Sequence, residues 1–349
     1  MLGGTENVVL QLCQIFKPLV NNIVVCSCGG VNVEKLNDMG IKHYEIPDIE
    51  NKDPKSVLNT FRLVRSIIKK ENITVIHTHH RMAAFYVSKM RLDRKCLFIN
   101  TCHNIFDNKK YLTVFSYKKA NLIACGEMVK KNLTDFFNLP ANSIKVIHNA
   151  VKPFENKIIL DDTVRKFHEE GCFVIGNIGR LSPQKGMEYY LKAIPLVLKE
   201  HKNCRFLIVG SGEDEKKLKK LANESGIKEY VVFLGYREDI QNLMSQLDLI
   251  VLSSLWEGLP LTPIEAFSVG KTIVATAVDG TVEIIDNKVD GLLVEPADEE
   301  QIAQKINWLL EQPERKAIME QNAQKKYDNG FSFSIFSDSY ENYYRELKR

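Results

Sequence analysis

Short apolar runs alternate with amphipathic segments of helix length along the whole chain of 349 residues. The runs are rich in Val, Ile and Leu and nearly uninterrupted, which is typical of strands buried on both faces of a parallel sheet. In the first half they predict strands at residues 22–28, 43–46, 74–78, 96–101, 122–125 and 145–147. In the second half they predict strands at residues 172–179, 204–210, 231–235, 249–254 and 272–276. Because helices fit between successive strands, the expected fold class is α/β.

The length of the chain and one polar segment predict two domains. A single core rarely grows beyond about 250–300 residues, and residues 149–171 form a polar stretch with a proline between the two runs of strands. We expect two Rossmann-like parallel-sheet domains facing each other across a cleft, over residues 1–152 and 153–330. The remaining residues, 331–349, carry aromatic and apolar side chains at helical spacing. We expect them to form a helix that caps the second domain or crosses back to the first.

The chain starts at a pair of glycines, Gly3 and Gly4, and an apolar helical pattern follows them at once. In α/β proteins such a glycine loop usually follows a strand. No segment of strand length precedes it here. The first domain is therefore predicted to lack its first strand, a segment of roughly five to eight residues.

Composition narrows the class of protein without identifying it. Apolar residues make up 44% of the chain and charged residues 26%, as in ordinary globular domains. None of the eight cysteines forms a CxxC pair, and Cys26 and Cys28 alternate within an apolar run, so we expect buried, reduced thiols in a cytoplasmic protein. Residues 1–20 lack the pattern of a signal peptide, and no apolar run approaches the roughly 20 residues that cross a bilayer.

Charge is distributed unevenly between the two halves. Residues 1–153 contain 22 lysines and arginines against 12 acidic residues, whereas the remainder contains 25 against 32. The basic excess predicts an anionic partner for the first half, either a phosphate-bearing acceptor or a lipid surface; solvated surface charge is the alternative. Basic clusters such as residues 91–95 lack the interleaved aromatic residues of a base-stacking surface, so no nucleic acid partner is expected.

The densest group of candidate functional residues spans 256–276 and follows a predicted strand directly. Ligands of parallel α/β sheets bind at the carboxyl ends of the strands, and a helix beginning near Leu261 would direct free N–H groups and its positive dipole end to that point. Glu257 follows the strand, and Glu265 lies eight residues later, about one turn into the helix. A carboxylate at that position can accept hydrogen bonds from ribose hydroxyls. The alternative is that both residues are solvated acids at helix ends.

A second group follows the strand predicted at 172–179. Arg180 and Lys185 lie five residues apart on a loop bounded by glycines, and two fixed cations there can neutralise a diphosphate. A surface loop with two unrelated charges is the alternative. A third glycine loop at 210–215 is weaker evidence, because such loops are also needed simply to turn the chain. Together, the cations, the helix end and the carboxylate predict a site for a nucleoside diphosphate.

Four histidines lie near strand ends in the first half. His77, His79 and His80 belong to one such end, and His103 follows another. We weigh His80 and His103 as sugar or acceptor contacts against hydrogen-bonded histidines of a cleft or core. A zinc site is conceivable, because His77 and His79 project to the same side of a strand, but no metal site is expected.

Several segments of the chain, in the expected order, resemble the retaining glycosyltransferases of family 4, which have the GT-B fold. EGLPLTPIE (257–265) resembles the E-x7-E element of that family, and GRLSPQKG (179–186) resembles its Arg…Lys diphosphate loop. The further matching segments are GGTENVVLQL (3–12), VIHNAV (146–151, with alanine in place of glycine), LGYREDI (234–240) and DGTVEIIDNKVDGLLVEPAD (279–298). The resemblance covers essentially the whole chain. In the second domain the motifs, taken as a set, are specific for the family, whereas those of the first domain match it only approximately.

The resemblance implies roles for the matching residues of the second domain. Arg180 and Lys185 would bind the donor diphosphate and stabilise the leaving group. Glu265 would bind the ribose, and Glu257 would contact hydroxyls of the donor sugar. The backbone of one turn would frame the sugar and phosphate: Gly258, Leu259, Pro260 and Leu261. The residues placed near the nucleotide base are Tyr236 and Arg237.

For the first domain the resemblance implies contacts with the reacting groups. Gly3, Gly4 and His80 would approach the diphosphate or the acceptor, and His103 would face the reacting sugar. The residues implied to take part in catalysis are therefore His103, Glu257, Arg180 and Lys185. Residues 62–71 and 109–120 both mix basic and apolar side chains. Such helices either pack on a core or dock peripherally on an anionic membrane.

No DxD motif occurs in the sequence, so we expect no metal-bridged diphosphate and no cofactor. The charge developing on the departing diphosphate would then be stabilised by Arg180, Lys185 and the helix end. The resemblance implies retention of configuration, by attack on the same face without a protein nucleophile. We expect a bacterial hexosyltransferase of the surface-polysaccharide type, at the inner face of the cell membrane. It would transfer a hexose or N-acetylhexosamine from a nucleotide-diphosphate sugar, specifically a UDP-sugar, to a glycan or polyprenyl-linked acceptor.

Two alternatives to this function stay open. A UDP-sugar 2-epimerase on a GT-B-like frame would need catalytic acids facing C2 of the sugar and would turn over donor without an acceptor. A catalytically inactive homologue would bind nucleotide only. The presence of Arg180, Lys185, Glu257 and Glu265 argues against the inactive homologue.

Overall fold

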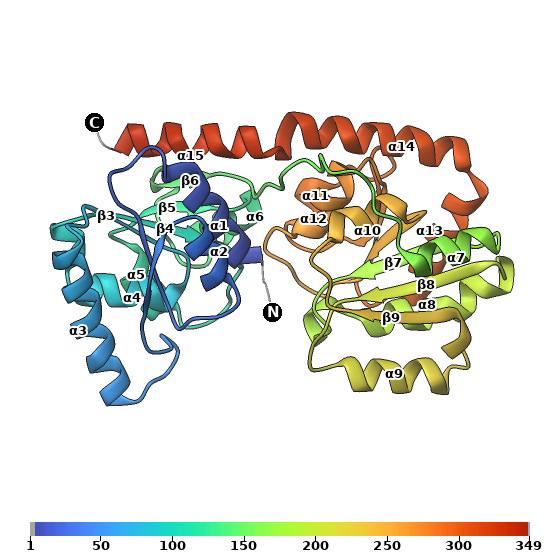
Figure 1. Cartoon of the computed structure of the whole chain (residues 1–349), viewed down its shortest axis with the longest axis horizontal. Coiled ribbons are helices and arrows are strands. Elements are labelled where there is room, and N and C mark those ends of the chain that lie inside the picture. Colours follow the sequence, from blue (N-terminus) through green and yellow to red (C-terminus); the bar gives the residue numbers. More distant parts are fainter. Residues whose placement is uncertain (1–3, 348–349) are drawn as a thin grey trace. The chain divides into compact units, whose positions relative to one another are not determined.

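The computed structural model describes residues 4–347, which form two compact units (Figure 1). Unit 1 consists of Met1–Asn149 and Phe336–Arg349, and unit 2 consists of Ala150–Ile335. Our predicted divisions, at 152/153 and 330/331, lie a few residues away. Every strand of both units pairs in parallel, so the predicted α/β class with two Rossmann-like domains is confirmed.

Unit 2 is built on one six-stranded sheet in the order β12-β11-β10-β7-β8-β9. Its strands are β7 (Phe173–Ile178), β8 (Cys204–Val209), β9 (Val231–Gly235), β10 (Leu249–Leu252), β11 (Ile273–Thr276) and β12 (Leu292–Val294). Its helices are α7 (Asp162–Glu169), α8 (Met187–Glu200), α9 (Glu215–Glu224), α10 (Ile240–Gln246), α11 (Leu261–Ser268), α12 (Thr281–Ile284), α13 (Glu299–Glu311) and α14 (Pro313–Lys326). Strands β10 and β11 are buried at every position, because helices cover both faces of a doubly wound sheet.

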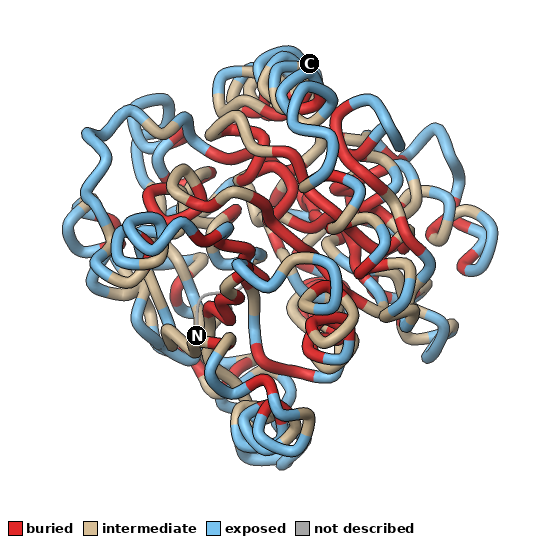
Figure 2. Tube along the Cα trace, turned by 90° about the vertical axis from the view of Figure 1, so that its right-hand side faces the viewer, coloured by how far each residue is buried: buried red, intermediate tan, exposed pale blue. Residues whose placement is uncertain are grey.

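The order of these strands locates the point at which the chain reverses its direction across the sheet. From β7 the chain first adds β8 and β9 on one side, and then β10, β11 and β12 on the other. This is the Rossmann order, and ligands of such sheets bind where the order reverses, outside the carboxyl ends of the two central strands. In unit 2 those strands are β7 and β10. Figure 2 shows the buried part of the chain trace at the centre and the exposed part along outer helices and loops.

Unit 1 contains two parallel sheets rather than one. Strands β1 (Val24–Ser27) and β2 (Lys42–Glu45) pair with each other, while a second sheet has the order β3-β4-β5-β6. The strands of the second sheet are β3 (Val75–Thr78), β4 (Leu97–Cys102), β5 (Asn121–Ala124) and β6 (Ile144–Val146). The helices are α1 (Gly4–Phe16), α2 (Asn32–Asp38), α3 (Pro54–Lys70), α4 (Arg81–Lys89), α5 (Lys110–Tyr117) and α6 (Glu127–Asp135). Helix α1 begins at Gly4, the first residue that the structure describes, so the expected lack of a first strand stays a prediction.

Helix α15 (Phe333–Leu347) supplies part of the core of unit 1 (Figure 1). Tyr340 is buried, and its hydroxyl lies 3.2 Å from Thr101 Oγ1, across 239 residues of sequence. The Tyr344 hydroxyl lies 2.7 Å from His77 Nδ1, and its ring packs on Phe16 with centroids 4.3 Å apart. The last helix therefore completes the domain in which the chain began.

Every predicted strand is present, with its ends shifted by a few residues at most, and β12 is a strand that we did not predict. All eight cysteines are free. The expectation that Cys26 and Cys28 are buried was wrong, because both are exposed. The reason is that β1 has only one neighbouring strand, β2, so its apolar run is less enclosed than the strands inside the larger sheets. Within residues 4–347, no helix is both long enough and apolar enough to cross a bilayer.

Candidate functional site

The candidate donor site of unit 2 lies where β7 and β10 end side by side. These strands pair in parallel, so the loops that follow them, residues 179–186 and 253–260, leave the sheet at the same edge. Ser253 Oγ donates a hydrogen bond to the Lys185 carbonyl at 3.0 Å, which ties the loops together. Gly186 has φ +54°, and a Cβ there would lie 2.2 Å from the Ser253 carbonyl oxygen. Only glycine allows the loops to approach this closely.

Lys185 and Glu257 form an ion pair at the junction of these loops. The Lys185 Nζ to Glu257 Oε1 distance is 2.5 Å, and the side chains are only 17% and 7% exposed. Ser254 Oγ donates to the same carboxylate oxygen at 2.7 Å, and Gln184 Nε2 lies 3.5 Å from the other oxygen. Solvent and salt screen such a shielded pair only weakly. The structure thus brings the predicted diphosphate lysine and the predicted sugar carboxylate into one hydrogen-bonded group.

Glu265 belongs to the same neighbourhood, on α11. Burial raises the pKa of its carboxyl to about 7, although the nearby Lys185 ammonium lowers it. Helix α11 begins at Leu261, directly after the buried turn of Gly258, Leu259 and Pro260, and its first N–H groups have no partner within the helix. This is the turn predicted to frame the sugar and phosphate.

Arg180 lies on the loop after β7, as predicted, but its side chain is exposed. Among the residues that the structure describes, no hydrogen bond or ion pair holds its guanidinium. Lys185 is held by Glu257, so the two predicted phosphate cations differ in how firmly contacts hold them. The first is available to follow a ligand, and the second is held in place.

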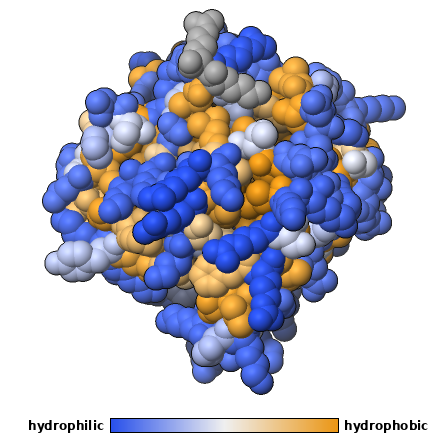
Figure 3. Space-filling view, turned by 90° about the vertical axis from the view of Figure 1, so that its left-hand side faces the viewer, coloured by the Kyte–Doolittle hydropathy of each residue, from blue (hydrophilic) through white to orange (hydrophobic). Residues whose placement is uncertain are grey.

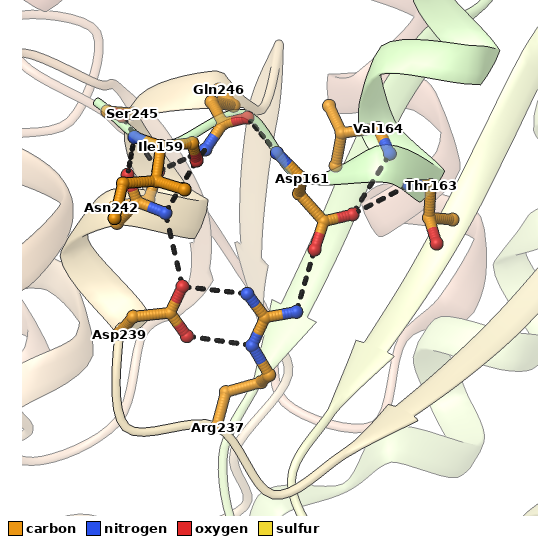
Figure 4. Close-up of polar contacts among 9 residues, drawn as sticks. All are labelled: Ile159, Asp161, Thr163, Val164, Arg237, Asp239, Asn242, Ser245 and Gln246. Atoms are coloured by element: carbon orange, nitrogen blue, oxygen red, sulfur yellow. Dashed lines mark hydrogen bonds and ion pairs between the residues drawn. The ribbon is translucent and has the colours of Figure 1, made fainter.

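Arg237 occupies a different environment, at the end of β9 (Figure 4). Its Nε and one terminal nitrogen each donate to Asp239 at 2.7 Å, and the other terminal nitrogen donates to Asp161 at 2.7 Å. These bonds raise the pKa of the guanidinium and lower the pKa of Asp239 to about 2. Asp161 also accepts the N–H groups of Thr163 and Val164 and so caps α7. Arg237 therefore fastens the segment before α7 to the loop before α10.

Tyr236 lies next to Arg237 in the sequence, and its side chain is 44% exposed. Arg237 already donates three hydrogen bonds to carboxylates, so a contact with a nucleotide base would have to leave these bonds in place. The placement of Tyr236 and Arg237 near the base stays a prediction.

His103, in unit 1, ends a stack of three histidines. His79 Nδ1 lies 3.1 Å from His103 Nε2, and the rings of His77 and His79 lie 4.2 Å apart. Burial lowers the pKa of His77 to about 3, that of His103 to about 4, and that of His79 well below its ordinary value. All three imidazoles are therefore neutral at pH 7. Within the described part of the chain, no three His, Cys, Asp or Glu side chains are arranged to hold a metal ion.

His80 and Gly4 are placed by local structure. His80 caps α4: its Nδ1 accepts the Met82 N–H at 3.2 Å, and its Nε2 lies 3.2 Å from Glu50 Oε1. Gly4 is the first residue of α1 and is exposed. Gly3 lies outside the described residues. The acceptor or diphosphate role of these residues stays a prediction.

Three residues of the donor site were not singled out from the sequence. Ser254 and Gln184 hold the Glu257 carboxylate, and Asp279, on the loop after β11, accepts the Glu257 N–H at 3.1 Å. The usable signal for Ser254 and Asp279 was their position at the end of a buried strand, where parallel sheets place ligands.

Both units are α/β folds built on parallel sheets, and in unit 2 charged residues gather where the strand order reverses. These features are typical of doubly wound proteins that bind ligands at strand ends. Residues 161–326 match the family model described as Glycosyl transferases group 1, and residues 2–153 match Glycosyltransferase Family 4. The chain therefore belongs to the glycosyltransferases with the GT-B fold.

Relatives and solved structures agree with this assignment. UDP-Gal:alpha-D-GlcNAc-diphosphoundecaprenol alpha-1,3-galactosyltransferase of Escherichia coli is 28% identical over 377 residues, covering 99% of this chain and 95% of that protein. The structure of a glycosyltransferase from Rickettsia africae ESF-5 has a TM-score of 0.85 at 24% identity, covering 100% of this chain and 96% of that one. Anabaena Alr3699/HepE in complex with UDP-glucose has a TM-score of 0.85 at 22% identity, covering 99% and 97%. At these identities the two structures show the fold alone.

Proposed function

We propose that the protein is a retaining hexosyltransferase of surface-polysaccharide synthesis. It transfers a hexose or N-acetylhexosamine from a UDP-sugar to a glycan or polyprenyl-linked acceptor, without a metal. The observation that carries this proposal is the shielded Lys185–Glu257 pair at the reversal point of unit 2, with the turn into α11 and Glu265 beside it.

Each part of this group suits one part of the donor. The Lys185 ammonium and the exposed Arg180 guanidinium neutralise the diphosphate as it departs, and the free N–H groups at the start of α11 add a fixed positive potential. Glu257 accepts hydrogen bonds from sugar hydroxyls through the oxygen that Lys185 and Ser254 leave free. Glu265 binds the ribose hydroxyls. The acceptor hydroxyl attacks the anomeric carbon on the face that the diphosphate leaves, and its proton passes to the departing diphosphate.

Support for a UDP-sugar and a lipid-linked acceptor comes from the relatives. The name of the Escherichia coli enzyme gives UDP-Gal as donor and a diphosphoundecaprenol-linked acceptor, and the Anabaena structure contains UDP-glucose. The basic excess of residues 1–153 gives an anionic lipid diphosphate a favourable potential.

We also propose that unit 1 contacts an anionic membrane surface from the inner face of the cell membrane. Tyr111 of α5 is 93% exposed. Lys110 is the first residue of this helix, and Lys109, Lys118 and Lys119 flank it. An exposed aromatic ring among basic side chains is the usual composition of an interfacial contact. Figure 3 shows hydrophobic side chains interspersed among hydrophilic ones on a face of unit 1.

The test is a donor screen with purified protein. Thermal stability and donor hydrolysis are measured with UDP-, GDP- and ADP-sugars. We expect a UDP-sugar to raise the melting temperature, and Lys185→Ala to abolish that shift. Lys199→Ala, which removes an exposed lysine of α8, is the matched control. If no nucleotide stabilises the protein, the donor site is wrong. Conversion of a UDP-sugar to its C2 epimer without an acceptor would instead establish the epimerase alternative.

A further inference from the structure

Asp279 holds the backbone of Glu257 from a neighbouring loop. It follows β11, which pairs in parallel with β10, so both loops leave the same edge of the sheet. Asp279 Oδ2 accepts the Glu257 N–H at 3.1 Å. At the next position, a Cβ on Gly280 would lie 1.9 Å from the Gly258 carbonyl oxygen. The two loops therefore interlock at the residue that carries the candidate sugar carboxylate.

The backbone of Asp279 adopts a conformation that most residues with a side chain avoid. Its φ is +35°, a left-handed conformation that glycine adopts without strain and that other residues adopt at a cost. Strained positions of this kind cluster at functional sites, where surrounding contacts maintain them. A glycine would form the turn with less strain, but it would offer no oxygen to the Glu257 N–H.

Neighbouring residues consequently hold both the backbone and the carboxylate of Glu257. Asp279 fixes its backbone, while Ser254 and Lys185 fix one oxygen of its carboxylate at 2.7 and 2.5 Å. With the backbone released, the carboxylate would remain held firmly at that oxygen, while its second oxygen would have only the long 3.5 Å contact with Gln184 Nε2 and could turn away from a ligand. Beyond this long contact with Gln184, the direction of the second oxygen is set by the backbone of Glu257, which Asp279 fixes.

We propose that Asp279 is a positioning residue for the donor sugar. By fixing the Glu257 backbone it aims the carboxylate at the sugar hydroxyls, and so it sets how much more tightly the site binds a UDP-sugar than UDP itself. This inference rests on the proposed function of the donor site and adds to it the residue that determines recognition of the sugar.

The experiment compares Asp279→Gly with Asp279→Asn. The glycine variant relieves the left-handed strain and removes the acceptor oxygen, whereas the asparagine variant keeps an acceptor. Binding of UDP and of UDP-glucose, UDP-galactose and UDP-N-acetylglucosamine is measured by calorimetry, and the tightest of the three sugars is carried forward. For Asp279→Gly we expect roughly tenfold weaker binding of that UDP-sugar, with UDP affinity nearly unchanged. For Asp279→Asn we expect wild-type affinities for both.

A double-mutant cycle shows whether the effect passes through Glu257. In a Glu257→Ala background, Asp279→Gly should cause no further loss of UDP-sugar affinity. Melting curves accompany every variant, and Asp279→Ala replaces Asp279→Gly if the glycine variant does not fold.

The outcomes separate this inference from the proposed function. Equal losses for UDP and UDP-sugar, or a loss that persists in the Glu257→Ala background, would mean that Asp279 only supports the loop, and the inference would be wrong. Failure of Asp279→Asn to retain sugar affinity would also overturn it. If the wild-type protein binds neither UDP nor any UDP-sugar, the proposed function fails, and the inference fails with it.

Discussion

Replacing Lys185 with alanine should destabilise unit 2 even when no nucleotide is added. The substitution removes the ammonium 2.5 Å from Glu257 Oε1 and leaves a carboxylate that is only 7% exposed. Ser254 and Gln184 remain within hydrogen-bond distance of this carboxylate, but neither carries a charge. The expected loss therefore arises from an uncompensated charge that water reaches poorly.

The size of the loss follows from the geometry. At 2.5 Å and an effective dielectric constant of about 20, the attraction between the two charges is about 7 kcal/mol. Desolvation of both groups offsets most of it, so the pair itself adds little net stability. Removing one partner of a buried pair, however, costs about 3–5 kcal/mol. We expect about 3 kcal/mol for Lys185→Ala, because Gln184 and Ser254 remain, and a melting temperature lower by roughly 6–12 °C.

The assay can be made specific for unit 2. The chain contains two tryptophans, Trp256 and Trp308, and both lie in unit 2, so their fluorescence reports its unfolding in urea. Four proteins are compared: wild type, Lys185→Ala, Glu257→Gln and the double variant. Glu257→Gln should cost less than Lys185→Ala, because the 17% exposed lysine can turn toward water.

The double variant decides between coupled and independent residues. It should regain about 2 kcal/mol relative to the sum of the single losses, because no unpaired charge remains. If the two single losses simply add, Lys185 and Glu257 do not form one group in solution. The reasoning that assigns them to a shared donor site would then be refuted.

Further predictions concern pH and membranes. The pKa of Glu265 is about 7 in the folded protein, so the unfolded chain loses this proton at lower pH than the folded protein does. The free energy of unfolding should therefore fall by about 3 kcal/mol as pH rises from about 4.5 to 7. Glu265→Gln should remove this fall, as measured in urea titrations. The lowered pKa values of His77 and His103 act in the opposite direction. Stability should fall as pH drops below about 6.5, by about 2 kcal/mol per histidine at pH 5, and His77→Asn should reduce the loss in circular dichroism melts. Tyr111→Asp should weaken sedimentation with phosphatidylglycerol vesicles severalfold and leave unit 1 stable, since this side chain is 93% exposed; equal binding by both proteins would contradict the membrane contact.

The sequence predicted the strands well because burial on both faces leaves a nearly continuous apolar run, as in β10 and β11. The sequence could not show how many neighbours a strand has, and for that reason the exposure of Cys26 on β1 and of Cys28 just after it was not predicted. The three-residue strand β12 was too short to produce a pattern of its own.

The site was predictable in its components but not in its connections. Each candidate residue at a strand end could be found from local pattern, because parallel sheets bring those ends together. The pairing of Lys185 with Glu257 joins residues 72 apart, and that of Arg237 with Asp161 joins residues 76 apart. No local pattern specifies such partners. The contact of Asp279 with Glu257 could not be predicted for the same reason, because Glu257 lies on another loop.

The return of helix α15 to unit 1 has a consequence for how the protein is made. Tyr340 and Tyr344 complete contacts with Thr101 and His77, so a chain emerging from the ribosome cannot close unit 1 until α15 (Phe333–Leu347) has been synthesised. Unit 2, which is contiguous from Ala150 to Ile335, has all of its residues available earlier. The half of the chain translated first is therefore the half completed last, and its partly built sheets depend longest on protection from aggregation.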